Sequence, residues 1–165
     1  MINFAKNLNM KTRILFVCHG NICRSPMAEF IFKNLVASQG MADLFYIESA
    51  AVSTEEIGNP IYPPARRCLN AHAVPFDSSK TARQITRSDY ARFDLIICMD
   101  SMNLRWLRYI IPDDPENKVH LMMSFAGSNR DVADPWYTGD FETTYNDILT
   151  ASEQLLKKFS TKKFY

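Results

Sequence analysis

An eight-residue segment near the start of the chain combines a thiol, a guanidinium and residues that form tight loops. Its members are Cys18, His19, Gly20, Asn21, Ile22, Cys23, Arg24 and Ser25. Gly20 and Asn21 tolerate the positive φ angles that let successive backbone N–H groups line a concave anion site. Arg24 adds a planar fork that matches phosphate oxygens. We therefore expect residues 18–25 to form a phosphate-binding loop that curls round one tetrahedral anion.

The thiol of Cys18 is the candidate nucleophile of this loop. Cys18 ends a predicted strand, and the loop leads into a predicted helix, whose N-terminal N–H groups and dipole favour an anion. Helix N-termini and nearby cations also favour the thiolate form of cysteine, which is the reactive form. We expect Cys18 to be a thiolate near neutral pH, with Ser25 donating a hydroxyl hydrogen bond to it.

Three other interpretations of the segment have less support. A buried structural cysteine before an ordinary capped helix is the simplest of them. A zinc site made by Cys18, His19 and Cys23 would lack a second ligand pair at the usual spacing, and neither His72 nor His120 has a metal motif around it. A nucleotide-triphosphate loop would need a Gly-Lys-Ser/Thr ending, which is absent. We therefore predict neither a metal nor a cofactor.

A thiolate that attacks an aryl phosphate needs an acid to protonate the leaving oxygen, which typically accelerates such reactions about 10²–10⁴-fold. Asp134 is the candidate, because it lies in a polar loop over about 124–139 beside Pro135, which restricts its backbone. Asp-Pro also marks ordinary turns, so the residues alone leave this assignment open. Asp100 is a rival carboxylate with a more structural position, and Asp131 lacks flanking aromatic residues.

Strand and helix patterns alternate along the chain. Apolar runs predict strands over 13–18, 45–50, 94–99 and 119–122. The first predicted helix has Ser25 as its N-cap and runs to about 39. Further helices are predicted from 63 to about 72, after a capping box at 86–89, from about 101 to 111, and from about 140 to 159. This alternation indicates an α/β fold with a parallel sheet and helices on both faces. Ligands bind beyond the carboxyl ends of such strands, where the loop after the first strand lies.

The size and composition of the chain limit its class. Its 165 residues favour a single domain, expected over 10–160, with a lead-in at 1–9 and a tail at 161–165. A formal net charge of +1 gives no general attraction to nucleic acid or to an anionic membrane. The chain contains no apolar stretch of about 18 residues, and residues 1–9 are too weakly apolar for a secretory signal. We expect a cytoplasmic protein with four free cysteines.

Residues 17–29, Val-Cys-His-Gly-Asn-Ile-Cys-Arg-Ser-Pro-Met-Ala-Glu, closely resemble the signature of the low-molecular-weight protein tyrosine phosphatases. The resemblance runs from about residue 10 to residue 159 and includes matching segments at 48–51, 57–60, 82–86, 98–100 and 134–137. It implies a single-domain four-stranded parallel sheet flanked by helices and no metal. It also implies phosphotyrosine-containing proteins as substrates, with inorganic phosphate and other oxyanions as competitive ligands.

The resemblance also implies roles for individual residues. Cys18 would attack phosphorus, Arg24 would stabilise the transition state, and Asp134 would act first as general acid and then as general base on a cysteinyl-phosphate. The residues that would support the loop are Asn21, Ser25, Ser49 and His72. For His72, a helix-end histidine with its own partners is an equal alternative. Cys23 would form a reversible disulfide with oxidised Cys18, unless it is a small buried filler.

The expected cleft walls bear on the substrate. Trp136 and Tyr137 lie beside the candidate acid and would flank an aromatic ring. Glu55 stands where the family often has an aromatic residue. It would disfavour acidic phosphopeptides or select basic flanks, unless it is an ordinary solvated glutamate. His19 replaces a small or apolar residue and would either stabilise the thiolate or line the rim. Ile22 favours phosphotyrosine, since related protein-arginine phosphatases carry threonine at that position.

Three rival functions remain at this stage. The first is a protein-arginine phosphatase with a similar loop. The second is a thiol-dependent arsenate reductase, which would need further redox cysteines; the remaining ones, Cys68 and Cys98, are 30 residues apart rather than a close pair. The third is a non-catalytic phosphoprotein-binding or redox-sensing module, which would not need Asp134.

Overall fold

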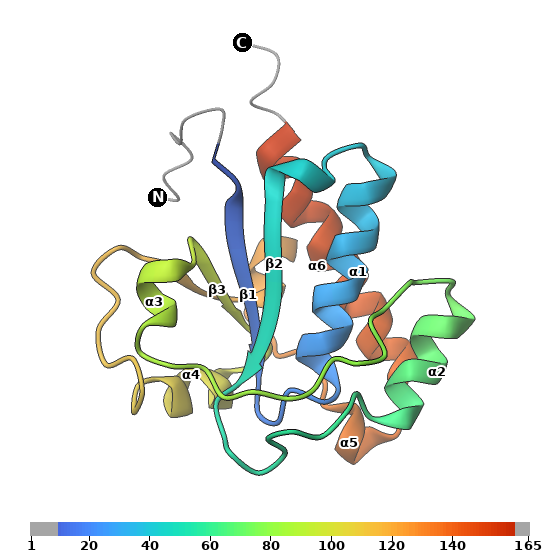
Figure 1. The fold of residues 1–165 in the computed structure, drawn as a ribbon, viewed down its shortest axis with the longest axis horizontal. Helices are drawn as coiled ribbons and strands as arrows, with labels where there is room; N and C mark the ends of the chain where they lie inside the picture. Colours follow the sequence, from blue (N-terminus) through green and yellow to red (C-terminus); the bar gives the residue numbers. More distant parts are fainter. Residues whose placement is uncertain (1–9, 161–165) are drawn as a thin grey trace.

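The computed structural model describes residues 10–160, so the lead-in expected at 1–9 and the tail expected at 161–165 lie outside the described residues. Within the described part, four strands form one parallel sheet in the order β2-β1-β3-β4 (Figure 1). The strands are β1 (Thr12–Cys18), β2 (Phe45–Ala51), β3 (Leu95–Cys98) and β4 (Val119–Leu121). This arrangement confirms the predicted four-stranded parallel sheet.

Helices follow the strands and cover both faces of the sheet. They are α1 (Arg24–Ser38), α2 (Pro63–Ala71), α3 (Asp89–Arg92), α4 (Ser101–Leu107), α5 (Pro135–Thr138) and α6 (Phe141–Ser160), with short 3-10 helices η1 (Ala42–Leu44) and η2 (Met122–Ala126). Helices α1, α2 and α6 lie on one side of the sheet, and α3 and α4 lie on the other (Figure 1). Over residues 10–160, no helix has the length and apolar character that a membrane span requires.

Strand β1 runs between β2 and β3 and contributes to two hydrophobic cores. Ile14 and Phe16 belong to the core beneath α1 and α6, whereas Leu15 and Val17 belong to the core beneath α3 and α4. None of these four side chains is exposed to solvent. This double burial explains the unbroken apolar run, because a parallel strand covered on both faces has no solvent-facing positions.

Parallel pairing brings the carboxyl ends of the strands to one edge of the sheet. Cys18 at the end of β1 pairs with Ala51 at the end of β2, and Val17 pairs with Cys98 at the end of β3. The loop that follows β1 therefore begins in the middle of this edge, and α1 begins immediately after the loop. Open α/β sheets place their binding sites in this position.

The start of α1 differs from its prediction. The helix begins at Arg24 with Cys23 as its N-cap and no side-chain cap, so the prediction that Ser25 caps it is wrong. Ser25 lies inside the first turn, and its hydroxyl contacts Cys18 and Asn21 in the preceding loop. The tight curl of the loop carries Ser25 past the capping position, and its hydroxyl becomes part of the loop.

The segment 124–139, predicted as a polar loop, contains more regular structure than expected. It includes the end of η2 and all of α5. Asp134 caps α5 by accepting the backbone N–H of Trp136, and Gly139 ends α5 with a positive φ of 70°. A helix of one turn gives too short an apolar pattern for sequence periodicity to detect.

Candidate active site

The loop after β1 turns through one residue in the left-handed region. Asn21 has a φ of 61°, whereas Gly20 does not have a positive φ, so the conformational role predicted for Gly20 is wrong. A Cβ at Gly20 would lie 3.2 Å from Cγ of Glu56, a tight contact. Glycine therefore lets the opposite wall approach the loop closely, and Asn21 alone supplies the turn in this loop.

Side-chain hydrogen bonds hold Asn21 in this conformation. Its amide nitrogen donates to the hydroxyl oxygens of Ser25 at 2.8 Å and Ser49 at 2.9 Å. Its amide oxygen accepts the backbone N–H of Arg83 at 3.2 Å. Asn21 is only 1% exposed, so these bonds replace all contact with water. The structure thus brings together Asn21, Ser25 and Ser49, three of the four residues predicted to support the loop.

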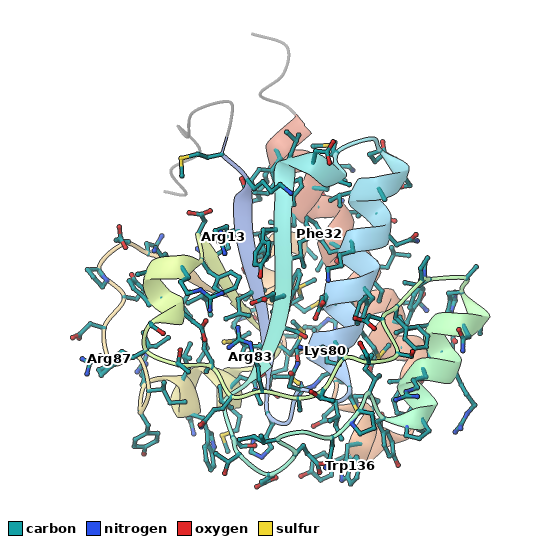
Figure 2. All side chains as sticks on the ribbon, in the orientation of Figure 1. Arg13, Phe32, Lys80, Arg83, Arg87 and Trp136 are labelled. Atoms are coloured by element: carbon teal, nitrogen blue, oxygen red, sulfur yellow. The ribbon has the colours of Figure 1, made fainter. Side chains whose placement is uncertain are left out.

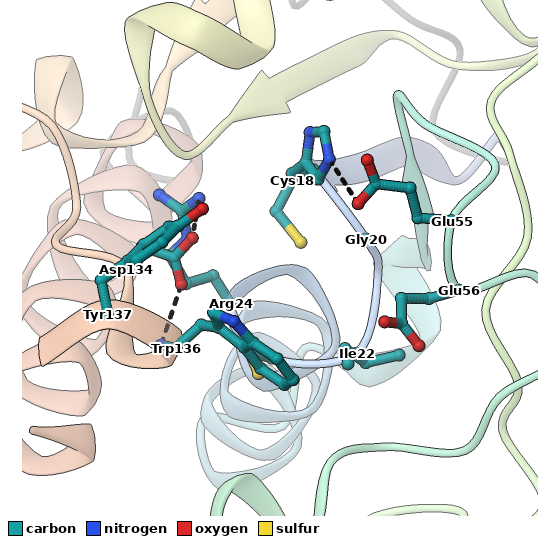
Figure 3. A pocket seen from close by; sticks show the side chains of 11 residues that line it. Cys18, Gly20, Ile22, Arg24, Glu55, Glu56, Asp134, Trp136 and Tyr137 are labelled. Atoms are coloured by element: carbon teal, nitrogen blue, oxygen red, sulfur yellow. Dashed lines mark hydrogen bonds and ion pairs between the residues drawn. The ribbon is translucent and has the colours of Figure 1, made fainter. Parts of the chain in front are cut away.

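The thiol of Cys18 lies at the floor of the loop. Its sulfur is 3.0 Å from the Ser25 hydroxyl oxygen, and it accepts the backbone N–H of Asn21 at 3.3 Å. The Asn21 N–H is a donor of the kind that stabilises a thiolate, and the Ser25 hydroxyl would add a second one when its hydrogen points at the sulfur. Cys18 is 4% exposed, and what remains accessible faces a cavity (Figure 3).

Arg24 is buried among negative and carbonyl partners. Its Nη1 donates to Asp100 at 2.7 Å and to the Val132 carbonyl oxygen at 2.8 Å, and its Nη2 donates to Asp134 at 3.3 Å. Burial alone would lower the pKa of Arg24, but the negative charges of Cys18, Asp100 and Asp134 outweigh it and raise the pKa. The guanidinium is therefore a fixed positive charge beside the thiol.

Asp134 shares a cavity of about 230 Å³ with the thiol and the guanidinium (Figure 3). Oδ1 accepts the N–H of Trp136 at 3.0 Å, and Oδ2 lies 3.3 Å from Arg24. Its side chain is 27% exposed, so the carboxylate can reach both a bound ligand and water. The full set of lining residues is Cys18, His19, Gly20, Ile22, Cys23, Arg24, Glu55, Glu56, Asp134, Trp136 and Tyr137.

The two walls of this cavity differ in character. Trp136 and Tyr137 lie on the same side as the acid, and the Trp136 ring packs against Tyr62 with centroids 4.9 Å apart. Glu55 lies on the opposite side (Figure 3), and Nε2 of His19 is 3.0 Å from its carboxylate. One wall is aromatic and the other carries acidic groups, as the sequence predicted for Trp136, Tyr137 and Glu55.

Behind the loop lies a charged group that the sequence analysis missed. Buried Glu29 accepts the Ser49 hydroxyl at 2.6 Å. Lys80 Nζ donates to the Ser49 carbonyl oxygen at 3.0 Å and lies 3.8 Å from Glu29. Lys80 and Arg83 both reach toward the end of β2 from the same extended segment (Figure 2). Helical spacing in α1 and the position of Lys80 in a polar stretch gave no signal for this arrangement.

His72 does not support the loop, so that prediction is wrong. Its ring stacks on Tyr145 with centroids 3.7 Å apart, and Nε2 lies 2.8 Å from Glu142. Tyr145 and Glu142 both belong to α6, so His72, which directly follows α2, faces α6 rather than the loop. The alternative of a helix-end histidine with its own partners is therefore correct. Lys80 fills the supporting position instead.

The remaining sulfur and carboxylate candidates have distinct surroundings. Cys23 lines the cavity beside Cys18 and is a free thiol in the structure. Burial, followed by the negative charges of Cys18 and Asp134, raises the pKa of Cys23, which favours the neutral thiol. Asp131 accepts the N–H of Ser101 at the start of α4, which is a structural contact.

Comparison with known proteins gives a consistent family match. The model of a family described as low molecular weight phosphotyrosine protein phosphatase matches residues 13–164. A phosphatase of that name from Pongo abelii is 41% identical over 150 residues, covering 88% of this chain and 94% of the relative. The crystal structure of YfkJ from Bacillus subtilis has a TM-score of 0.88 at 36% identity, covering 95% of this chain and 99% of that one. The structure of a Drosophila arginine phosphatase has a TM-score of 0.81 at 30% identity, covering 93% and 100%.

Proposed function

The chain belongs to the low molecular weight phosphotyrosine protein phosphatase family, and we propose that it hydrolyses phosphotyrosine in proteins, and small aryl phosphates, through a cysteinyl-phosphate intermediate. The observation that carries the proposal is the single cavity shared by Cys18, Arg24 and Asp134. A hydrolase of this class needs a nucleophile, a charge stabiliser and an acid within reach of one phosphoryl group.

In the first step, the Cys18 sulfur attacks phosphorus in line with the leaving oxygen. The sulfur–phosphorus bond forms, the bond from phosphorus to the phenolic oxygen breaks, and Asp134 gives its proton to that oxygen. Arg24 and the backbone N–H groups of the loop hold the three equatorial oxygens as charge redistributes. Support for this role of Arg24 comes from its burial and its fixed orientation between Asp100 and the Val132 carbonyl.

In the second step, water hydrolyses the intermediate. Asp134, now ionised, takes a proton from a water molecule, whose oxygen attacks phosphorus while the sulfur–phosphorus bond breaks. Cys18 leaves as a thiolate, which the Ser25 hydroxyl and the Asn21 N–H stabilise. The contacts that support this step are those of the Cys18 sulfur with Ser25 at 3.0 Å and Asn21 at 3.3 Å.

Phosphotyrosine is the favoured substrate. Trp136 and Tyr137 offer aromatic surface beside the acid, and the ring of a substrate would pack against them. Ile22 lines the same cavity with an apolar side chain. Phosphoarginine is the second candidate, because a structural neighbour is described as a Drosophila arginine phosphatase. Inorganic phosphate and other oxyanions should compete with either substrate, and the expected compartment is the cytoplasm.

Turnover of p-nitrophenyl phosphate in the presence of a chelator tests the reaction. Wild type should hydrolyse it, Cys18→Ser should be inactive, and Asp134→Ala should be strongly impaired. Undiminished turnover by Cys18→Ser would refute the thiol mechanism. Absence of turnover by wild type, with phosphopeptide binding retained, would favour a non-catalytic binding module.

Peptides carrying phosphotyrosine, phosphoarginine or phosphoserine then identify the substrate. The proposal predicts the highest kcat/KM for phosphotyrosine. Ile22→Thr is the informative variant, because it introduces the residue that the resemblance associates with arginine phosphatases. A wild-type preference for phosphoarginine would replace the proposed substrate while leaving the thiol mechanism intact.

A further inference from the structure

A cysteine, a histidine and a glutamate meet between α2 and α6, outside the cavity described above. Cys68 lies in α2, His72 directly follows it, and Glu142 lies in the first turn of α6. A thiol sulfur, an imidazole nitrogen and a carboxylate oxygen from these residues all lie within 4.8 Å of one another. None of the three takes part in the proposed reaction.

One distance among these groups matches the spacing of two ligands around a metal ion. The Cys68 sulfur is 3.6 Å from Oε1 of Glu142. Ligands about 2.0–2.3 Å from a tetrahedral zinc ion lie about 3.4–3.7 Å from one another. Cys68 and His72 are four residues apart at the end of a helix, a spacing that puts both on one side. His72 Nε2 lies 2.8 Å from the other Glu142 oxygen, a contact that an ion would replace.

The surroundings hold the ligands and leave a path for an ion. The His72 ring is stacked on Tyr145 at an interplanar angle of 9°, which fixes the plane of the imidazole. Cys68 is buried, whereas the Glu142 side chain is 59% exposed. Cys68 and Glu142 line an open cavity of about 640 Å³. A cation could therefore enter from solvent and reach a buried sulfur.

We propose that Cys68, His72 and Glu142 bind one zinc-class divalent cation. Thiolate and imidazole ligands favour Zn²⁺ or Co²⁺ over Mg²⁺ and Ca²⁺, which prefer oxygen. The thiol of Cys68 gives its proton to solvent as it binds, and a water molecule completes the coordination. The ion would link α2 to the start of α6, the helix that follows the Asp134 segment. The ion would stabilise the contact between α2 and α6. It takes no part in the reaction at Cys18, so a chelator should leave the phosphatase activity intact.

Titration of the Cys18→Ser variant with Co²⁺ tests the site, because this background removes the nucleophilic thiol of the phosphate-binding loop. The expected result is one equivalent bound, with the charge-transfer absorption of a cobalt–thiolate bond. Adding Cys68→Ser should abolish that absorption, and adding His72→Gln should weaken binding at least about tenfold. His120→Gln in the same background is the matched control and should bind Co²⁺ unchanged.

Thermal unfolding gives an independent measurement. Zn²⁺ should raise the unfolding temperature of Cys18→Ser and of its His120→Gln derivative, but not that of its Cys68→Ser derivative. If Cys68→Ser does not fold, Glu142→Gln takes its place, since Glu142 is largely exposed. Absence of the cobalt–thiolate absorption in Cys18→Ser, or its persistence in a folded Cys68→Ser derivative, would overturn the proposal. Neither result would affect the proposed phosphatase reaction.

Discussion

Asn21 has a left-handed backbone conformation, which asparagine tolerates better than most residues do. At a φ of 61° the residue lies in the left-handed region, which costs an L-residue roughly 1–2 kcal/mol. Three hydrogen bonds, to Ser25, Ser49 and Arg83, offset that cost and close the loop around the thiol. The side chain of Asn21 thus contributes hydrogen bonds, and its backbone contributes the turn of the loop. Substitutions can separate the effects of these two contributions on stability.

Asn21→Ala and Asn21→Gly form a matched pair. Both lose the three side-chain hydrogen bonds, but only alanine retains the strain of a positive φ. We expect both variants to lose activity, with Asn21→Ala about 1 kcal/mol less stable than Asn21→Gly. Urea unfolding of the two variants measures the difference. Equal stability would mean that the left-handed conformation contributes nothing to the cost of substitution.

Asp134→Asn tests the general acid through the leaving group. For phosphotyrosine, kcat/KM should fall about 10²–10⁴-fold, because asparagine cannot protonate the phenolic oxygen. Aryl phosphates whose phenols are more acidic should lose less, since their oxygens depart without protonation. The measurement is kcat/KM, which reports the first step, across a series of aryl phosphates for wild type and variant. A loss of the same size for every leaving group would contradict an acid role.

Sequence reasoning at this scale succeeded where chemistry constrains residue type. Residue chemistry and spacing predict the roles of Cys18 and Arg24, whereas the choice of Asp134 rests on the family resemblance; all three line one cavity. It failed where the answer depended on packing. Lys80 and Glu29 meet beside Ser49 only because α1 and the segment after α2 lie next to β2, which no local pattern reveals.

Among the secondary structure elements, the segment that leads into α3 anchors the loop indirectly. The backbone N–H of Arg83 donates to the Asn21 side chain, and its guanidinium donates to Asp89 at 2.9 Å. Asp89 also accepts the N–H and hydroxyl of Thr86 and is 0% exposed. Half of the predicted capping box therefore forms, because Asp89 accepts from Thr86, but Thr86 does not cap α3, which begins at Asp89 with Ser88 as its N-cap.

The pH dependence of stability tests this anchor. Burial alone would raise the pKa of Asp89, but hydrogen bonds from Arg83 and Thr86 outweigh it and lower the pKa. Its stabilisation is therefore fully present above the unfolded-state pKa of about 3.9 and is lost as pH falls through the folded-state pKa. Asp89→Asn should lower the free energy of unfolding by about 1.5–3 kcal/mol at neutral pH. The difference in this free energy between variant and wild type should become smaller below a pH of about 4.

Denaturant unfolding of wild type and Asp89→Asn at several pH values gives the comparison. Asp43→Asn is the control, because Asp43 is exposed in η1 at the opposite end of β2. A gap between Asp89→Asn and wild type that stays constant into acid would show that the charge of Asp89 is not what stabilises the segment.

Long elements were predictable from their patterns, and short ones were not. The apolar run of β1 and the amphipathic stripe of α6 are long enough to identify a strand and a helix. The single turn of α5 is not, and its start depends on the Asp134 cap. The start of α1 was also misplaced. Serine is a residue type that often caps helices, but here the Ser25 hydroxyl accepts a hydrogen bond from Asn21 in the loop.

The whole molecule is nearly neutral, so the charges that a substrate meets are those at the cavity mouth. Formal net charge is +1, whereas Glu55 and Glu56 both line the cavity wall opposite Trp136. Nε2 of His19 contacts only one of them, Glu55. The local potential at this wall is therefore set by a few side chains and should act on residues that flank the phosphotyrosine.

Glu55→Gln should shift the preference among phosphopeptides. Removing one carboxylate at the rim should raise kcat/KM for peptides with acidic flanks by up to about fivefold, as expected for an exposed charge. Added salt should reduce the effect, because exposed charges are screened. Glu116→Gln is the control, since Glu116 precedes β4 and lies near the amino ends of the strands. A change of equal size in that variant would argue against a local effect.

At the scale of the fold, the alternation of strands and helices predicted the correct α/β class. The apolar periodicity of each element and the order of the elements can both be read directly from the sequence. The contact between α2 and α6 did not follow from order alone. It brings His72 to Glu142, 70 residues away, and so removes His72 from the loop. Tertiary packing determines such contacts, and no local sequence pattern predicts them.

The central claim is that Cys18 carries the phosphoryl group during turnover. The Asp134→Asn variant should accumulate the intermediate from p-nitrophenyl phosphate, since this leaving group needs little protonation but hydrolysis still lacks its base. Acid quenching followed by peptide mass spectrometry should find one phosphoryl group on Cys18, and none in a Cys18→Ser control. Turnover without a phosphorylated Cys18, or a phosphoryl group on another residue, would contradict the account.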